Sequence, residues 1–238
     1  MPAFFQLPHI ESCSKRVRAL FGGEFVADSG NAKLVWEHAY YPVFYFPKDE
    51  VLQKYLKSGS DGTYDIVVGS KTARGAVKAF KDDSKLAGLL RVDFKAMDAW
   101  FEEDEQVFVH PKDPYKRVDV LQSSRHVRVE VNGVEVANSH RPRFLYETGL
   151  PVRTYIPKTD CRLDLLVPSE LTTQCPYKGI ANYYNVKTVP DEEPVKNVVW
   201  WYRNPNLECA AINGFVAFYD EKVDVWIDGE KQVDPRNK

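Results

Sequence analysis

An internal repeat constrains this chain more than any other feature of its sequence. Residues 15–48 align with residues 125–158 at a constant offset of 110 residues and without a gap. Ten aligned positions carry the same residue, where chance at about 6% identity would give two or three. A repeat at this spacing approaches the size of a small domain, so the 238 residues predict two copies of one fold, residues 1–112 and 113–238.

The repeated segment has the pattern of antiparallel β-strands. Residues 127–131 and 134–138 alternate apolar and polar side chains around Asn132-Gly133. Asn-Gly between two such runs is a strong hairpin signal, because both turn residues take a positive φ. The first copy has Gly22-Gly23 at the same place. The sequence therefore predicts a mainly β protein of two repeated antiparallel domains.

Outside this segment the two copies are expected to differ. A short helical turn is predicted in each, at residues 86–90 and 207–212, and residues 50–56 of the first copy are also helix-prone. The second copy contains an additional strand-like run, residues 162–167, followed by the Cys-Pro-Tyr-Lys-Gly segment at 175–179. Chemistry that depends on this segment is expected in the second domain alone.

The composition excludes several classes of protein. A net charge of -2 and 28% charged residues give no bulk attraction to nucleic acid or anionic lipid. No run approaches the ~18 apolar residues of a membrane helix, and the N-terminus lacks a signal-peptide pattern. We expect a cytoplasmic protein with no nucleic-acid or membrane partner. The oligomeric state is left open.

Neither a metal nor a cofactor is expected. The four cysteines are far apart and form no Cys-x-x-Cys pair, and no two of the five histidines stand at metal-ligand spacing.

The segment Cys175-Pro-Tyr-Lys-Gly179 is the most suggestive chemically. A cysteine three residues from a lysine is suited to be a thiolate nucleophile, and the phenol of Tyr184 follows closely. Cys175, Lys178 and Tyr184 are therefore the candidate catalytic residues. The alternatives are that Cys175 lines a pocket or is a buried structural residue, since most single cysteines are inert.

A second group of polar residues is predicted to bind substrate: Arg143, Tyr146, Glu147, Arg153 and Tyr155. If their two strands pair, Glu147 and Arg153 come near each other as an ion pair or an anion site. Glu147 and Tyr155 are repeated as Glu37 and Tyr45, which a structural role would also produce. Arg153 has no charged counterpart in the first copy, which favours ligand contact.

Three segments of the sequence, residues 98–129, 141–157 and 175–179, closely resemble the domain-of-unknown-function family numbered 427. The resemblance covers essentially the whole chain as a tandem arrangement. It implies compact, mostly β domains similar to the β-tent folds of methionine sulfoxide reductase B and Mss4-like proteins, with no settled activity. Those proteins bind structural zinc through Cys-x-x-Cys pairs, which this chain lacks.

Three functions remain open at this point. The first is a small-molecule site for an anionic metabolite in the second domain, with cofactor-free lyase, isomerase or hydrolase chemistry. The second is a non-catalytic module that binds a metabolite or peptide. The third, a metal-dependent nucleotidyltransferase, has weak support, because the adjacent Asp82 and Asp83 after Gly69-Ser70 would point to opposite faces of a strand.

Overall fold

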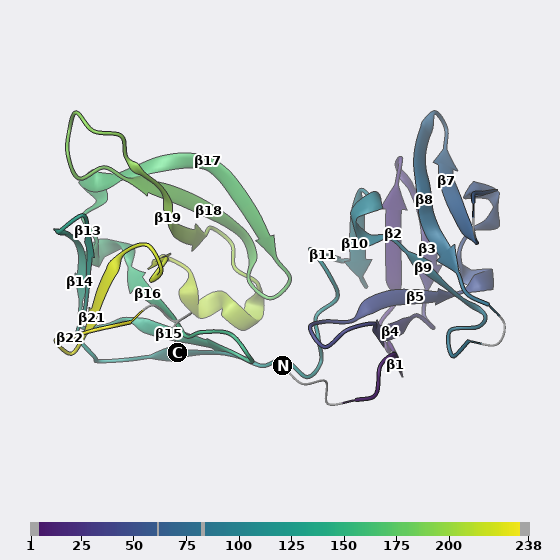
Figure 1. The fold of residues 1–238 in the computed structure, drawn as a ribbon, viewed down its shortest axis with the longest axis horizontal. Helices are drawn as coiled ribbons and strands as arrows, with labels where there is room; N and C mark the ends of the chain where they lie inside the picture. The colour runs from purple at the N-terminus through teal and green to yellow at the C-terminus, as the bar shows by residue number, and fades with distance from the viewer. Residues whose placement is uncertain (1–4, 61, 82–83, 234–238) are drawn as a thin grey trace. The chain divides into compact units, whose positions relative to one another are not determined.

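The chain divides into two compact units, Met1–Asp113 and Pro114–Lys238, called unit 1 and unit 2 below (Figure 1). The structure is a computed structural model that describes residues 5–60, 62–81 and 84–233. Both units consist of antiparallel strands with short 3-10 helices, so the prediction of a mainly β fold with two repeated domains is confirmed.

Unit 1 contains a seven-stranded and a four-stranded antiparallel sheet. Its elements are β1 (His9–Ser12), β2 (Val17–Phe21), β3 (Glu24–Ser29), β4 (Lys33–Trp36), β5 (Val43–Pro47), η1 (Lys48–Glu50), η2 (Gln53–Tyr55), β6 (Leu56–Ser58), β7 (Thr63–Val68), β8 (Lys71–Ala79), β9 (Leu89–Val92), η3 (Phe94–Ala96), β10 (Ala99–Glu102) and β11 (Glu105–Val107). The sheet orders are β1-β4-β5-β9-β8-β7-β6 and β11-β10-β2-β3.

Unit 2 repeats this topology. Its elements are β12 (Val118–Gln122), β13 (Val127–Val131), β14 (Val134–Ser139), β15 (Arg143–Glu147), β16 (Arg153–Pro157), η4 (Lys158–Asp160), η5 (Leu163–Leu165), β17 (Leu166–Cys175), β18 (Gly179–Val186), β19 (Val195–Tyr202), η6 (Leu207–Ile212), β20 (Phe215–Phe218), β21 (Asp224–Ile227) and β22 (Glu230–Lys231). The sheet orders are β12-β15-β16-β20-β19-β18-β17 and β14-β13-β21-β22.

The hairpin predicted from Asn132-Gly133 is present in both units. Asn132 and Gly133 have φ of 51° and 77°, and Gly22 and Gly23 have φ of 60° and 84°. These values are those of a two-residue turn with both residues in the left-handed region. The register also shifts inside both hairpins, between Ala19 and Leu20 and between Val129 and Glu130, so the two copies share a bulge.

Two of the predicted helical segments are wrong. Residues 85–88 form a turn, and β9 starts at Leu89, because its alternately buried side chains pair with β5 and β8. Residues 50–56 contain only the end of η1, the 3-10 turn η2 and the start of β6. The helical segment at 207–212 is confirmed as η6, which is followed by Gly214 at a φ of 82°.

The strand-like run at 162–167 is not an insertion. It forms η5 and the start of β17, and unit 1 has the equivalent η2 and β6. The two units differ in length instead, since β17 has ten residues and β6 has three. The long β17–β18 hairpin is prominent in Figure 1 and ends at the Cys-Pro-Tyr-Lys-Gly segment.

Both faces of the seven-stranded sheet of unit 2 carry buried side chains. On one face, Ile156 of β16 belongs to an apolar core together with Val127 and Val129 of the four-stranded sheet. On the other face, Tyr155 belongs to a separate buried cluster with Trp200 and other aromatic residues. We call these the inner and outer faces. Among the described residues, the four-stranded sheet contributes to the core on the inner face and not to the cluster on the outer face.

Among the described residues, the longest helix has six residues, and no helix is long and apolar enough to cross a membrane. The cytoplasmic location remains a prediction from the sequence.

The positive φ of Gly133 predicts a measurable cost when a side chain is added. A Cβ at Gly133 would contact nothing within 4 Å, so Gly133→Ala introduces backbone strain alone. We expect about 1–2 kcal/mol of destabilisation. Gly30→Ala is the control, since Gly30 also has open space but no positive φ. Urea unfolding of both variants tests this, and equal effects would contradict the assigned turn.

Candidate functional site

A cavity of about 260 Å³ opens on the outer face of the seven-stranded sheet of unit 2. The strand register explains why, since Arg143 lies opposite Tyr155 and Leu145 opposite Arg153, which places these four side chains on one face. We call this space the tyrosine cavity. Its lining residues are Leu145, Glu147, Leu150, Pro151, Arg153, Tyr155, Thr173, Lys178, Tyr183, Trp200, Tyr202 and Tyr219.

An ion pair between Lys178 and Glu147 lies at one side of the tyrosine cavity. Lys178 Nζ donates to Glu147 Oε2 at 2.5 Å, and the side chains are only 13% and 6% exposed. Burial acts to lower the pKa of Lys178, but the neighbouring Cys175 and Glu147 outweigh it, so the net pKa lies above its ordinary value. Lys178 therefore remains an ammonium group that donates hydrogen bonds.

The Cys-Pro-Tyr-Lys-Gly segment is the turn that holds Lys178 in place. Cys175 and Gly179 are the last paired residues of β17 and β18. Asn206 fixes the turn from outside, since its Nδ2 donates to the Pro176 carbonyl at 3.0 Å and its backbone N–H to the Lys178 carbonyl at 3.2 Å. Gly179 has a φ of 95°, and a Cβ there would lie 3.3 Å from Asn206 Oδ1. The segment thus has a clear positioning role for the lysine.

Arg153 lies in the same cavity but has different partners from those expected. Its guanidinium donates two hydrogen bonds to the Glu221 carboxylate, at 3.0 and 2.7 Å, and lies 3.7 Å from Asp220. It also lies 5.6 Å from the centre of the Trp200 ring. The ion pair expected between Glu147 and Arg153 is absent, because Glu147 pairs with Lys178 and Arg153 pairs with Glu221.

Tyrosine hydroxyls form the polar part of the remaining wall. Tyr155 is fully buried, and its hydroxyl accepts a hydrogen bond from Trp200 Nε1 at 3.1 Å. The hydroxyl of Tyr183 lies 2.8 Å from Thr173 Oγ1 and 3.4 Å from the hydroxyl of Tyr219.

Burial keeps the phenols of Tyr155, Tyr202 and Tyr219 protonated. It raises the pKa of Tyr155 and of Tyr202, and for Tyr219 the contact with Tyr183 raises the pKa further. These groups therefore exchange hydrogen bonds as neutral phenols at physiological pH.

Unit 1 keeps the scaffold of this site without its aromatic lining. Following the paired strands, Thr63 and Lys78 stand where unit 2 has Tyr183 and Trp200. The hydroxyl of Tyr45, the counterpart of Tyr155, donates to Glu37 Oε1 at 2.5 Å. The repeated Glu and Tyr are thus common to both folds, while the cavity lining belongs to unit 2.

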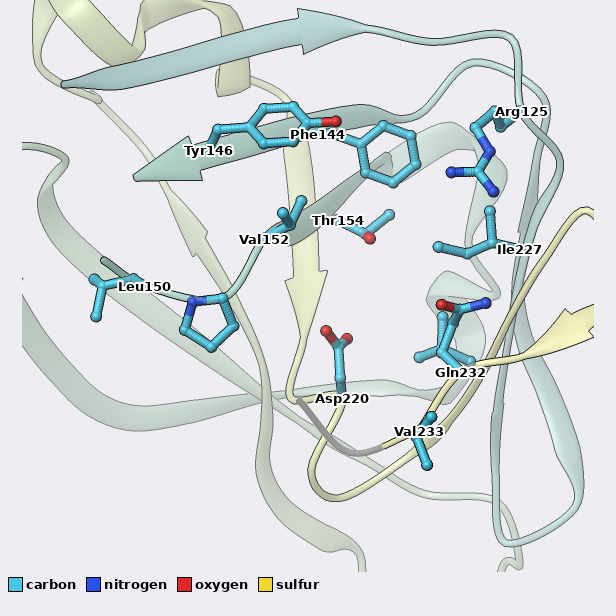
Figure 2. A pocket seen from close by; sticks show the side chains of 12 residues that line it. Arg125, Phe144, Tyr146, Leu150, Val152, Thr154, Asp220, Ile227, Gln232 and Val233 are labelled. Atoms are coloured by element: carbon cyan, nitrogen blue, oxygen red, sulfur yellow. The ribbon is translucent and has the colours of Figure 1, made fainter. Parts of the chain in front are cut away.

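Tyr146 is separated from the other predicted residues by strand alternation. It points to the inner face, where it lines a second cavity of about 440 Å³. Figure 2 shows Tyr146 and Phe144 of β15 and Thr154 of β16 along this cavity, with Ile227 and Gln232 across from them. Tyr146 and Arg153 therefore line different cavities.

Three further predicted residues do not line the tyrosine cavity. Arg143 donates to the Ala211 carbonyl of η6 and, at 3.2 Å, to Gln122 Oε1, so it fastens η6 to the sheet. Tyr184 faces the side opposite Tyr183 and stacks on Trp201, with ring centres 5.7 Å apart. The half-buried thiol of Cys175 is close enough to act on the pKa of Lys178 but is not among the lining residues.

The sequence reasoning missed Thr173, Tyr219 and Glu221. Thr173 lies on β17 beyond the strand-like run predicted at residues 162–167, and the register of β17 with β18 places it opposite Ala181. Tyr219 and Glu221 follow β20 directly, and only the pairing of β16 with β20 shows that they lie near Arg153. The sequence contains no local signal for such a contact over 68 residues.

The residues that resemble a nucleotidyltransferase motif give no support to a metal site. Ser70 lies in the turn between β7 and β8, and Asp82 and Asp83 lie outside the described residues. Within the described part of the chain, no three histidine, cysteine, aspartate or glutamate side chains come together to hold a metal ion.

The fold and the site together define a tandem β protein with an aromatic cavity on the outer face of its second unit. A family model described as a domain of unknown function (DUF427) matches residues 9–103 and again residues 119–229. The chain therefore belongs to this family, with one copy of the domain in each unit. A search of curated proteins finds no match. The likeness to β-tent folds stays a prediction.

The buried ion pair predicts an asymmetric mutational response. Lys178→Met leaves Glu147 buried without its partner, which costs about 3–5 kcal/mol, whereas the double variant with Glu147→Leu recovers most of that loss. Lys187→Met is the matched control, since Lys187 is exposed just beyond β18. Native-state hydrogen exchange of the core amides of unit 2 measures these differences. An effect of Lys178→Met no larger than that of the control would show that the pair does not form.

Proposed function

We propose that unit 2 binds a small organic molecule in the tyrosine cavity, with an oxygen atom of the ligand against Lys178. The observation that carries this proposal is the convergence of aromatic walls and polar donors on one opening. Ligand sites are typically concave and mostly apolar, with a few polar groups that set the orientation. Unit 1 has Thr63 and Lys78 in place of Tyr183 and Trp200, so the fold does not require this aromatic pair. The difference supports a binding role for Tyr183 and Trp200 in unit 2.

The size of the tyrosine cavity limits the ligand. At about 260 Å³ it is smaller than the range of roughly 300–1,000 Å³ for drug-sized molecules. A single ring or a short chain with a few polar atoms therefore fits, and a dinucleotide does not. The rings of Trp200 and Tyr202 favour a flat ligand body through stacking.

The charges around the tyrosine cavity favour a ligand that accepts hydrogen bonds. Lys178 has three N–H donors and gives one to Glu147, so a carboxylate or carbonyl oxygen can accept another. The hydroxyls of Tyr183 and Tyr219 can add donors of their own. The charge of Arg153 is neutralised by its hydrogen bonds to Glu221, so Arg153 forms part of the cavity wall and adds little attraction for an anion.

Binding without covalent catalysis is the better supported form of this proposal. The ammonium group of Lys178 is a protonated donor that is already paired with Glu147, and the thiol of Cys175 does not line the tyrosine cavity. One observation favours a catalytic alternative. Protonated Lys178 and two tyrosine hydroxyls around one cavity are the kind of donors that stabilise an enolate oxygen, which suits cofactor-free lyase or isomerase chemistry.

Calorimetric titration with a matched panel of probes tests the proposed function. We expect 4-hydroxybenzoate, a flat carboxylate, to bind unit 2, and the cation phenyltrimethylammonium not to bind. Lys178→Gln should weaken 4-hydroxybenzoate binding by roughly tenfold or more, the cost of about one charge-assisted hydrogen bond. Tyr183→Phe should weaken it by a smaller factor.

Lys187→Gln is the control, since it removes an exposed lysine outside the tyrosine cavity. If the probe binds Lys178→Gln and Lys187→Gln equally well, the lysine does not contact the ligand. If the cation binds better than the carboxylate, the proposed ligand class is wrong.

A further inference from the structure

A second lysine with unusual surroundings lies away from the tyrosine cavity. Lys158 Nζ is 3.1 Å from the centre of the Trp201 ring and donates to the hydroxyl of Tyr184 at 3.3 Å. Trp201 and Tyr184 stack nearly parallel, at an interplanar angle of 11°. The amine thus sits on an aromatic platform built from β18 and β19.

The local fold explains how the amine reaches this platform. Lys158 directly follows Pro157, the last residue of β16, and begins η4. Tyr184 pairs with Val199 and Asn182 with Trp201 across β18 and β19, so the two rings are diagonal neighbours on one face. The Lys158 stem spans from η4 to these rings.

Positive charge gathers at this platform without an acidic partner. The guanidinium of Arg203 lies 5.8 Å from the centre of the Trp201 ring. Among the described residues, neither Lys158 nor Arg203 forms a salt bridge with a carboxylate. Two unpaired cations near one another favour an added anion.

The groups that face Lys158 act on its pKa in opposite directions, since the charge of Arg203 lowers it whereas Cys161 acts to raise it. They are Tyr184 from β18, Arg203 after β19 and Cys161 after η4. Burial first, and then the charge of Arg203, lower the pKa of Lys158 to about 8. Burial also raises the pKa of Cys161 to about 12, so its thiol stays neutral near pH 7 and offers no counter-charge.

We propose that Lys158 is a reactive amine that forms an imine with small oxo acids, whose carboxylate Arg203 binds. The lone pair of Nζ adds to the carbonyl carbon, and the nitrogen then loses two protons. The carbonyl oxygen leaves as water with those protons, and a C=N bond remains. Neither an oxidant nor a reductant is needed. Lysines activated by a nearby cation and partial burial perform this kind of step.

The repeat supplies an internal control for this proposal. Lys48 of unit 1 occupies the position equivalent to Lys158, directly after the proline that ends β5. The strand position of Trp201 is taken there by Ala79, so Lys48 has no indole platform from that strand. The two lysines therefore share a backbone setting and differ in their surroundings.

Reductive trapping in the whole protein tests the proposal. The protein is treated with 1 mM glyoxylate and cyanoborohydride at about pH 7.5, and carboxymethyl-lysine is located by peptide mass spectrometry. At that pH roughly a quarter of an amine with a pKa of about 8 is unprotonated, against about 0.1% at the ordinary value of 10.5. We expect Lys158 to be modified at least tenfold faster than Lys48, and equal rates would overturn the proposal.

The pH profile tests whether Lys158 is a reactive amine, and an Arg203 variant tests whether Arg203 binds the carboxylate. The labelling rate of Lys158 should level off above about pH 8. Arg203→Gln should slow labelling by glyoxylate more than labelling by uncharged acetaldehyde. If Arg203→Gln slows both equally, Arg203 does not bind the carboxylate, and the oxo-acid preference is wrong. Arg74→Gln, in the β8 strand of unit 1, is the matched control.

Discussion

The alternation of side chains along the seven-stranded sheet of unit 2 is the constraint on which the rest of the structure depends. Neighbouring residues on a strand face opposite sides, so Glu147 turns to the outer face while Tyr146 turns to the inner one. In the same way Tyr183 lines the tyrosine cavity and Tyr184 stacks on Trp201. One sheet therefore carries two chemically different surfaces, whose cavities both border Leu150 and Pro151.

The ion pair of Lys178 and Glu147 connects this constraint to function. Taking both charges out of water is costly, and replacing such a pair by apolar residues is often neutral or stabilising. Unit 1 keeps Glu37 at the equivalent position but satisfies it with the Tyr45 hydroxyl and with Arg91, at 3.2 Å. Unit 2 instead extends β17 and β18 and uses their turn to place a lysine. The added length thus serves the tyrosine cavity, which supports a binding role for it.

The sequence alone predicts the repeat, the mainly β fold and the Asn132-Gly133 hairpin, because each depends on local spacing. It misassigns β9, since Leu89–Val92 is a strand only by virtue of its pairing with two distant strands. The site divides in the same way. Proximity of Glu147, Arg153 and Tyr155 follows from pairing the adjacent strands β15 and β16, but the approach of Lys178 and the actual ion partners do not. Glu221 comes near Arg153 only because β16 pairs with β20, and no local sequence pattern predicts that pairing.

The central claim is that the outer face of unit 2 holds a small ligand beside Lys178. A crystal structure of the whole protein soaked with 4-hydroxybenzoate tests it most directly. The account predicts electron density for the probe between Trp200 and Tyr183, with its carboxylate within hydrogen-bond distance of Lys178 Nζ. Density confined to the inner-face cavity of Figure 2, beside Tyr146 and Phe144, would contradict it.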